Sequence, residues 1–459
     1  MSYIKNRDQL LSHGNGWLRG LALDIIEHAL KQADPYAATK ALVSLDGNML
    51  SIGGLRLDLE KHGRIFLLGA GKATWPIAKA LEEIIGSRIA DGVIVCKYGQ
   101  QGELSRSRML LADHPIPDQS GLEASLEALE LAGRTQAGDI VLGCITGGSS
   151  ALLPLPVKPV SLEDKQQVNA LLLTCGANIV EINAVRKHLS QIKGGRLAMA
   201  VHPGAHLINL TVSDVIGDPL DYITDPTVPD TSTLADAAKT LTKYGLWKKV
   251  PGSVSRYLRN AGEDGETPKI ADLADRTSDD FIIVKGAAAC EAAAAKAADF
   301  GFNVWILSTM FEGESRELGR NFGAIASEIK LSSRPLNPPC ALIGGGETIV
   351  TLDGATGVGG PNQEFAASAA LCIDNLDNVV VVGLDSDGTD GPTDFAGAMV
   401  DGETASQARK AGIDLFESLK THGVTAPLVK LGDAIMTGAT GTNVNDLKIM
   451  LIAPDQKGA

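Results

Sequence analysis

The stretch IFLLGAGKATWPIAKALEE spans residues 65–83 and has the pattern of a strand, a turn and a helix, the unit from which α/β folds are built. Its apolar start is typical of a buried strand, and its second half has the apolar spacing of a helix. Between them lies a short glycine turn, Gly69-Ala70-Gly71, followed by Lys72. Such a turn presents backbone N–H groups at the start of a helix, where they attract an anion. The stretch therefore predicts an α/β fold with a phosphate-binding turn.

Strand-like and helix-like segments alternate along most of the chain, which is the pattern of parallel α/β sheets. A helix is expected over residues 17–45, and the buried-strand candidates are RIFLLGA, GVIVCK, DIVLGCIT, LINLTVSD, DFIIVKG, FNVWILS, CALIGGG, NVVVVGLDSDG and LKIMLIA. The 459 residues are too many for one hydrophobic core. A polar, charge-rich segment at residues 260–279 separates the earlier strands from the later ones. We therefore expect two α/β domains, residues 1–265 and residues 275–459.

The composition limits the classes of function. The formal net charge of −14 argues against general nucleic-acid binding, because a phosphate backbone requires a basic surface. The six cysteines include no C-x-x-C pair, so we expect reduced and mostly buried thiols. Neither a signal-peptide pattern nor an apolar run of membrane-spanning length is visible, which predicts a soluble cytoplasmic protein without a membrane partner. The choice between a monomer and a homodimer stays open.

The glycine turn does not fit a standard nucleotide fingerprint. A dinucleotide site needs G-x-G-x-x-G/A and an acidic residue after the next strand, but this chain has Thr74 and Lys97 at those places. A lysine suits the 2′-phosphate of NADP, so an NADP site remains an alternative. The phosphate loop G-x-x-x-x-G-K-[ST] is absent. Lys72 is a candidate phosphate contact, and the alternative is a solvated surface lysine.

A second glycine loop, TGGSSA at residues 146–151, follows the strand DIVLGCI. It differs from the nucleophile elbow G-x-S-x-G, because Ala151 replaces the last glycine and Pro154 prevents a long helix. We therefore expect a second phosphate-contacting loop, and the alternative is a plain turn with positive φ. Its candidate contacts are Gly147, Gly148, Ser149 and Ser150.

The segment NAVRKHLSQIKGGRLA, residues 183–198, concentrates positive charge in an acidic chain. Arg186 and Lys193 are predicted to share one face of a helix. Together with Arg196 they would attract a carboxylate or phosphate substrate. The alternative is structural, because cations near a helix C-terminus also stabilise the helix.

Carboxylates follow several of the predicted strands. Asp214 stands immediately after LINLTVS and is a candidate to hold Mg²⁺ or to orient a substrate hydroxyl. Asp385 and Asp387 follow the strand VVVVGL and are candidate Mg²⁺ ligands. An EF-hand is excluded, because Asp390 occupies the place of its glycine. The alternative is ordinary turn chemistry.

Two further polar residues stand near glycine-rich stretches. Glu347 follows three glycines, and Asn362 is a predicted cap at the start of the helix in GVGGPNQEFAASAA. Both are candidate substrate contacts.

Taken together, these motifs resemble those of the glycerate 2-kinases. The matching stretches run in family order through nearly the whole chain: LGAGKA, DHPIPD, TGGSSALLP, NAVRKHLSQIKGGRLA, SDVIGDPLD, PTVPD, GGGETIVTL, NQE, SDGTDGPTD and TGTNVNDL. The resemblance implies an N-terminal Rossmann-like kinase domain with a parallel sheet and flanking helices. It also implies a C-terminal α/β MOFRL domain and an active site in the cleft between the two domains.

The resemblance implies ATP-dependent phosphorylation of D-glycerate at its 2-hydroxyl, with Mg²⁺. The family's essential lysine falls on Lys72. The resulting assignments are Lys72, Asp214 and Lys193 for catalysis, Gly69, Gly71, Gly147, Gly148, Ser149 and Ser150 for ATP, Arg186, Arg196, Glu347 and Asn362 for the small anionic hydroxy acid, and Asp385 and Asp387 for Mg²⁺.

The chain departs from the family pattern most clearly at Pro361. The family usually reads G-G-R-N-Q-E where this chain has GGPNQE, and its arginine is expected to help catalysis or to bind an anionic group. A proline can do neither. Pro361 leaves two alternatives, a kinase of another small hydroxy acid and a nucleotide-binding regulator with a decayed site. Lys97 leaves a third, an NADP-dependent hydroxypyruvate reductase.

Overall fold

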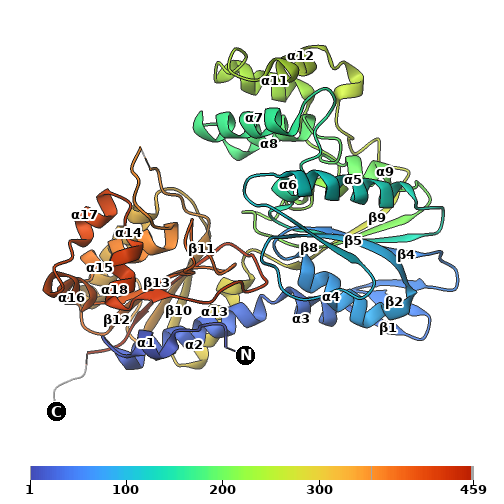
Figure 1. Ribbon diagram of the computed structural model, residues 1–459. Helices are drawn as coiled ribbons and strands as arrows, with labels where there is room; N and C mark the ends of the chain where they lie inside the picture. Colours follow the sequence, from blue (N-terminus) through green and yellow to red (C-terminus); the bar gives the residue numbers. More distant parts are fainter. Residues whose placement is uncertain (1, 353, 456–459) are drawn as a thin grey trace. The chain divides into compact units, whose positions relative to one another are not determined.

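The computed structural model describes residues 2–352 and 354–455, and the chain forms two compact units (Figure 1). Unit 1 consists of Met1–Asp34, Asp214–Gly217 and Val284–Ala459, and unit 2 consists of Pro35–Ser213 and Asp218–Ile283. This division differs from the two predicted ranges. The N-terminal residues group with the C-terminal half, and the last strand of the N-terminal sheet extends beyond the polar segment that suggested the boundary.

Unit 2 is built on a six-stranded sheet with the strand order β6-β5-β4-β7-β8-β9. Its strands are β4 (Ile65–Ala70), β5 (Ile89–Lys97), β6 (Arg108–Ala112), β7 (Ile140–Ile145), β8 (His206–Val212) and β9 (Thr277–Val284). The pairs β4–β5, β5–β6, β4–β7 and β7–β8 are parallel, as the alternating pattern predicts. The central strands β4 and β7 are buried along their whole length, because helices cover both faces of the sheet.

The helices on the two faces come from the segments between the strands (Figure 1). On one face lie α5 (Gln119–Gly133) and α9 (Arg196–Ala200). On the other lies α4 (Thr74–Ile85), with α3 (Pro35–Leu42) packed against it. A small antiparallel sheet adjoins these helices and consists of β1 (Val43–Asp46), β2 (Met49–Ile52) and β3 (Leu55–Asp58).

A separate helical group in unit 2 has a hydrophobic core of its own, which includes Val168, Val185, Leu241 and Val254. Its helices are α7 (Leu162–Thr174), α8 (Ile179–His188), α11 (Leu234–Lys243) and α12 (Gly252–Asn260). The short helices of unit 2 are α6 (Ser149–Leu152), α10 (Leu220–Ile223), η1 (Gly86–Arg88), η2 (Asp225–Thr227) and η3 (Glu263–Gly265).

Unit 1 contains a mixed six-stranded sheet with the strand order β10-β11-β15-β12-β13-β14. Its strands are β10 (Asn303–Phe311), β11 (Cys340–Gly346), β12 (Val379–Asp385), β13 (Gly397–Asp401), β14 (Ala434–Ile435) and β15 (Asp446–Ile452). Only the pair β10–β11 is parallel among the described strands of this sheet, so the parallel pattern that the alternation of strands and helices indicates holds for unit 2 and not for unit 1. The reason is β15, which runs antiparallel between β11 and β12.

Helices cover both faces of the unit 1 sheet as well (Figure 1). One face carries α1 (Arg7–Leu11), α2 (Gly16–Gln32) and α13 (Ala288–Asp299). The other carries α14 (Ser315–Ser332), α15 (Pro361–Cys372), α16 (Thr404–Lys410), α17 (Leu415–Lys420) and α18 (Thr425–Leu431). Within the described part of the chain, none of the helices combines the length and apolar character that a membrane crossing requires.

The single helix expected over residues 17–45 is in fact α2 and α3, which belong to different units. Pro35 explains the break, because proline disfavours a helical conformation at the residue before it. Arg19 of α2 is fully buried and binds two carboxylates of unit 1, those of Asp401 and Asp433. These ion pairs explain why the N-terminal helices belong to unit 1.

Candidate functional site

The carboxyl ends of β4 and β7 lie side by side in unit 2, with Ala70 opposite Ile145 in the parallel register. The turn after β4 and the loop after β7 are therefore neighbours at one edge of the sheet. Backbone hydrogen bonds join them: the N–H of Lys72 donates to the carbonyl oxygen of Gly147 at 2.8 Å, and the N–H of Thr146 donates to that of Ala70 at 2.9 Å. The two predicted phosphate loops form one continuous edge.

Gly71 is needed for this close approach. Its φ is +140°, and a β-carbon there would lie 2.1 Å from the hydroxyl oxygen of Thr146 and 2.6 Å from its carbonyl oxygen. The same hydroxyl accepts a hydrogen bond from the N–H of Ala73 at 3.2 Å. The hydroxyl of Thr74 donates to the carbonyl oxygen of Cys144 at 2.6 Å. Thr74, at the third position of the failed dinucleotide fingerprint, therefore ties the turn to β7.

Gly148 lies where two side chains from different strand ends converge. It has a φ of +86° and precedes α6, whose first two residues are Ser149 and Ser150. A β-carbon on Gly148 would lie 3.1 Å from Cγ of Lys72 and 3.4 Å from both Cδ2 and Nε2 of His114. The structure thus brings Lys72 together with the second glycine loop and adds His114, which sequence reasoning missed.

The basic segment does not form one continuous helix. α8 ends at His188, and residues 189–195 lead through a turn to α9. The prediction that Arg186 and Lys193 share a helix face is therefore wrong, because Lys193 lies in the turn. The physical reason is a tertiary contact: Ser190 forms a β-bridge with Pro156, and residues in such a bridge cannot continue the helix.

Lys193 carries a buried ammonium group. Its side chain is 1% exposed, and its Nζ has no hydrogen-bond partner among the described residues. The nearest carboxylate oxygen, Oδ2 of Asp225, is 3.7 Å away. Burial lowers the pKa of Lys193 to about 8, and the charge of Asp225 limits the decrease. Because an unpartnered buried donor is costly, this position suits an anionic ligand.

Two other cations of the basic segment, Lys187 and Arg196, make contacts within the fold. The guanidinium of Arg196 donates to four carbonyl oxygens, at 3.0, 2.8, 3.1 and 3.1 Å, which belong to Lys187, Ser190, Gly265 and Glu266. Lys187 is buried, and its Nζ donates to Asp230 at 3.0 Å. Burial alone would lower the pKa of Lys187, but the carboxylates of Asp225 and Asp230 outweigh burial and raise it. These contacts favour a structural role for Arg196, whose contact with a substrate stays a prediction.

Lys165 is a buried cation that sequence reasoning missed. It lies on α7 and donates from Nζ to the carbonyl oxygen of Pro154 at 2.9 Å. Burial, with the charge of Lys193 as a second cause, lowers the pKa of Lys165 well below its usual value. Arg186 donates from Nε to the side-chain oxygen of Asn169 at 3.1 Å, and burial lowers its pKa. The predicted pair of Arg186 and Lys193 thus belongs to a partly dehydrated basic region.

In unit 1, Asn362 lies inside the first turn of α15, which begins at Pro361. The carboxylate of Asp390 accepts hydrogen bonds from the N–H groups of Asn362 at 2.9 Å and Gln363 at 2.8 Å. The prediction that Asn362 caps this helix is wrong, because Asp390 satisfies these amides from another segment. Pro361 does not weaken the hydrogen bonding of α15, because the N–H that proline lacks has no partner within the helix at the first helical position.

The side-chain amide of Asn362 belongs to a buried network. Nδ2 of Asn362 donates to Oδ1 of Asp446 at 2.7 Å. Nζ of Lys448 donates to the side-chain oxygen of Asn362 and to Oδ2 of Asp446. The side-chain amide of Asn362 also donates to the carboxylate of Asp390. Burial raises the pKa of Asp390 to about 6. The network favours a structural role for Asn362, and its contact with a substrate stays a prediction.

The predicted Mg²⁺ ligands Asp385 and Asp387 lie at the end of β12 and in the loop after it. The N–H of Asp387 donates to Oδ1 of Asp385 at 3.0 Å, and the N–H of Thr389 donates to Oδ1 of Asp387 at 2.8 Å. These bonds hold both carboxylates in fixed orientations. Within residues 2–352 and 354–455, no group of three or more His, Cys, Asp and Glu side chains is placed to hold a metal ion.

The two remaining predicted residues follow strands directly. Asp214 comes two residues after the end of β8, and its Oδ2 accepts a hydrogen bond from the side-chain amide of Asn443 at 3.0 Å. Glu347 follows β11, and its N–H donates to the carbonyl oxygen of Phe311 at 2.9 Å.

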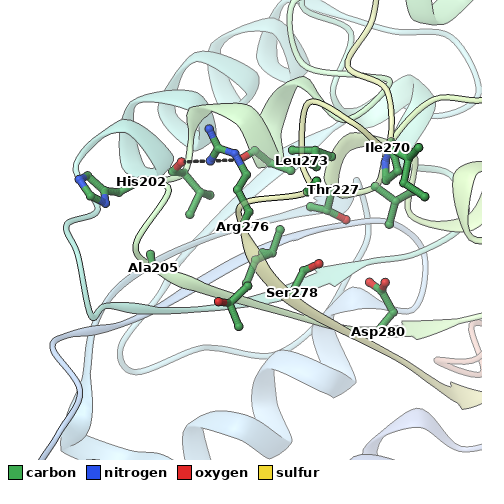
Figure 2. Close-up of a pocket in the computed structure, with 15 residues that line it drawn as sticks. His202, Ala205, Thr227, Ile270, Leu273, Arg276, Ser278 and Asp280 are labelled. Carbon is green, nitrogen blue, oxygen red and sulfur yellow. Dashed lines mark hydrogen bonds between the residues drawn. The ribbon is translucent and has the colours of Figure 1, made fainter.

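A cavity of about 240 Å³ lies elsewhere in unit 2, beside the starts of β8 and β9 (Figure 2). Its wall is largely apolar, and Ser278 and Asp280 contribute polar side chains. Arg276 at its border donates to carbonyl oxygens of Ala198 and Val201, which fixes the end of α9. None of the predicted site residues lines this cavity, so it is a different place from the edge that carries Lys72.

Two known families match this chain. Residues 21–259 match the family described as Domain of unknown function (DUF4147), and residues 340–446 match the MOFRL family. The first match covers the greater part of unit 2, and the second covers β11 to the start of β15 in unit 1.

Known relatives match over nearly the full length. The chain is 42% identical to Glycerate 2-kinase of Pyrococcus horikoshii, over 95% of this chain and 97% of the relative. It is 41% identical to D-glycerate 2-kinase of Thermotoga maritima, over 95% of this chain and 98% of the relative. The crystal structure of Glycerate kinase from Thermotoga maritima is similar with a TM-score of 0.80 at 40% identity, covering 95% of this chain and 99% of that chain.

Proposed function

The chain belongs to the glycerate 2-kinase family, and from this premise we propose that it phosphorylates D-glycerate at the 2-hydroxyl with ATP as the phosphoryl donor. The observation that carries the proposal is the edge of unit 2 at which Lys72 and two glycine turns from adjacent parallel strands meet. Backbone N–H groups beside a cation are the usual protein surroundings of phosphate groups.

Phosphoryl transfer needs positioning and charge stabilisation, with little covalent chemistry. In our proposal phosphate oxygens are held by N–H groups of the loop at residues 147–150, except that of Ser149, which donates to the carbonyl oxygen of Thr146 at 3.3 Å. The N–H of Gly71 already donates to the carbonyl oxygen of Val95 at 3.2 Å, so the first glycine turn contributes its close backbone approach. The ammonium of Lys72 neutralises charge on the transferred phosphoryl group. The backbone of Lys72 is already fixed by its hydrogen bond to Gly147. This bond fixes the point from which the side chain extends, and a bound phosphate would then order the ammonium.

The carboxylate of the acceptor is assigned to Lys193, with Arg186 as the second cation. Lys193 supports this role because its ammonium is buried and lacks a hydrogen-bond partner among the described residues. A bound carboxylate would supply that partner and offset the cost of burying the charge.

We assign the hydroxyl of the acceptor to Asp214, as the group that orients it or takes its proton. Mg²⁺ is assigned to Asp385 and Asp387, whose carboxylates are held by backbone N–H groups. This donor set fits the ion, because Mg²⁺ in kinases is commonly held by one or two carboxylates together with substrate phosphates. When bound, Mg²⁺ would neutralise charge on the phosphates of ATP.

A cytoplasmic location is part of the proposal. All six cysteines are free, and Cys96, Cys144, Cys290 and Cys340 are buried, which is the usual state of thiols in a reducing compartment. A homodimer remains a prediction, which light scattering on the purified protein would test.

The proposal predicts that purified protein with ATP and Mg²⁺ forms ADP only when a suitable hydroxy acid is added, and that D-glycerate is the best acceptor. The measurement is a coupled ADP assay over a panel of small hydroxy acids, with the product identified by NMR. The panel includes L-glycerate as the matched control for stereochemistry, together with tartrate- and erythronate-type acids.

Other outcomes of this panel would select an alternative function. A clearly better acceptor than D-glycerate would show that Pro361 marks a change of substrate within the family. Oxidation of NADPH that depends on hydroxypyruvate would support the reductase alternative, which was based on Lys97. ATP binding without turnover of any acceptor would indicate a regulator.

The KM for D-glycerate is expected to rise above pH 8, because Lys193 then loses the charge that binds the carboxylate. Burial lowers the pKa of Lys193 to about 8 from its usual 10.5, so the amine is protonated below pH 8 and neutral above it. At pH 9 the KM should be about tenfold higher than at pH 7. Initial rates at fixed ATP and varied D-glycerate measure this dependence.

The matched control for this pH profile is Lys193→Arg, because a guanidinium stays protonated over the whole range. Whatever activity this variant retains should lack the rise of KM between pH 7.5 and 9.5. A wild-type KM that stays flat over this range would remove Lys193 from carboxylate binding.

A further inference from the structure

We propose that His114 is a further catalytic residue, which donates a hydrogen bond from its imidazole to the phosphoryl group held by Lys72 and the second glycine loop. The inference rests on the proposed function and deepens it, because it adds a phosphate contact to the same edge of unit 2. It starts from the motif DHPIPD, to which the mechanism above gives no role.

The position of the ring is the first argument. Cδ2 and Nε2 of the His114 ring lie 3.4 Å from the point where a β-carbon on Gly148 would stand, and Cγ of Lys72 lies 3.1 Å from the same point. Three segments therefore meet around Gly148, and they follow three different strands: Lys72 follows β4, the glycine loop follows β7 and His114 follows β6. An anion bound by Lys72 and the loop would lie within reach of the imidazole.

The anchoring of the loop is the second argument. The segment between β6 and α5 is held at its start, because the N–H of Tyr98 donates to the carbonyl oxygen of Ala112 at 3.0 Å. It is held at its end by Asp118, which caps α5 by accepting from the N–H of Gly121 at 2.9 Å. A half-buried imidazole on such a fixed loop is presented without a large loss of conformational freedom on binding.

The chemistry is the third argument. An imidazole N–H is a suitable donor to a phosphoryl oxygen in either charge state of the ring, and in the protonated ring the bond is charge-assisted. Placed beside Lys72, it would add a second donor where negative charge develops during transfer. In this role no bond to His114 forms or breaks, and the residue contributes by stabilising charge.

The test compares His114→Ala with His114→Gln, which keeps a side-chain N–H donor. Losing a hydrogen bond to a charged group should lower kcat/KM for ATP by about tenfold to a hundredfold in His114→Ala. The KM for D-glycerate should change by less than about threefold, because its carboxylate is assigned to other residues. His114→Gln should recover most of the loss, and thermal unfolding of each variant shows whether the fold is intact.

The control is His202→Ala, which removes an exposed imidazole of the same unit that borders the cavity of Figure 2. It should leave both KM values and kcat unchanged. Kinetic constants for His114→Ala within twofold of the wild type would overturn the inference. So would equal losses in the alanine and glutamine variants together with an equally lowered melting temperature, because such losses indicate a structural role.

Calorimetric titration with ATP separates this inference from the proposed function. If the wild type phosphorylates no acceptor but binds ATP, the proposed function fails, and a Kd raised about tenfold in His114→Ala still supports the phosphate contact. An unchanged Kd in that case overturns it. If the wild type binds no ATP, both proposals fall together.

Discussion

Replacement of Lys72 with alanine is expected to lower kcat for D-glycerate phosphorylation about 1000-fold, because a single preorganised charge at a phosphoryl-transfer site contributes on the order of 10²–10⁵ in rate. The fold should be retained. The two glycine turns are joined by bonds from the N–H groups of Lys72 and Thr146 and by the hydroxyls of Thr74 and Thr146, and these bonds can form without the lysine side chain. Steady-state kinetics and thermal unfolding on the same preparations measure both effects.

The matched control is Lys79→Ala. Lys79 lies on α4, in the same strand-turn-helix unit, and its Nζ is 3.7 Å from Oε1 of Glu83 in a partly exposed i,i+4 pair. Such a pair contributes about 0.5 kcal/mol at most, so this variant should keep wild-type kcat and stability. Near-normal turnover in Lys72→Ala would remove Lys72 from the mechanism, whatever the control shows.

The fold of unit 2 could be predicted from local sequence patterns. Buried apolar runs that alternate with helices predict a parallel sheet, and the four strand pairs with a parallel register confirm it. The turn after β4 was recognised from Gly71 and Lys72 alone. The contact between Gly71 and Thr146 was not, because it joins segments 75 residues apart and depends on which strands are neighbours.

The topology of unit 1 was harder to predict, because the contacts that determine it join segments far apart in the sequence. β15, near the end of the chain, inserts antiparallel between β11 and β12, and an apolar run such as LKIMLIA does not reveal its direction. Arg19 is a similar case. In the sequence it is one cation on an amphipathic helix, whereas its carboxylate partners lie about 400 residues away.

In the candidate site, too, local sequence patterns did not reveal the residues that long-range contacts bring together. His114 was missed because β6, the strand that precedes it, was not among the predicted strands. Recognition of that strand would have pointed to His114, because ligands bind where the strands of a parallel sheet end. Lys165 gave no such signal, because it lies on a helix, and its burial follows from packing against the segment around Pro154. The turn that contains Lys193 was read as helix, because the bridge between Ser190 and Pro156 that ends α8 is a tertiary contact.

Replacement of Arg19 with methionine is expected to destabilise the protein by about 3–5 kcal/mol, because it leaves two buried carboxylates without their shared cation. Nε of Arg19 donates to Asp401 at 2.6 Å, and Nη1 donates to Asp433 at 2.9 Å. The three side chains are at most 3% exposed, so water cannot take over the role of the guanidinium. Denaturant unfolding, followed by circular dichroism, measures the loss. The control is Arg7→Met: Arg7 binds Asp24 at 2.7 Å on the surface, and such an exposed pair contributes only about 0–1 kcal/mol.

The same variant tests which unit the N-terminal helices belong to. If Arg19 anchors α2 to the sheet of unit 1, hydrogen exchange in Arg19→Met should accelerate in β12, β13 and α2, while the amides of β4 and β7 keep their protection. The predicted domain of residues 1–265 would give the opposite pattern, because α2 would then stabilise the parallel sheet. Faster exchange in β4 and β7 with unchanged β12 and β13 would therefore assign the N-terminal helices to unit 2, and it would contradict the grouping that the two ion pairs support.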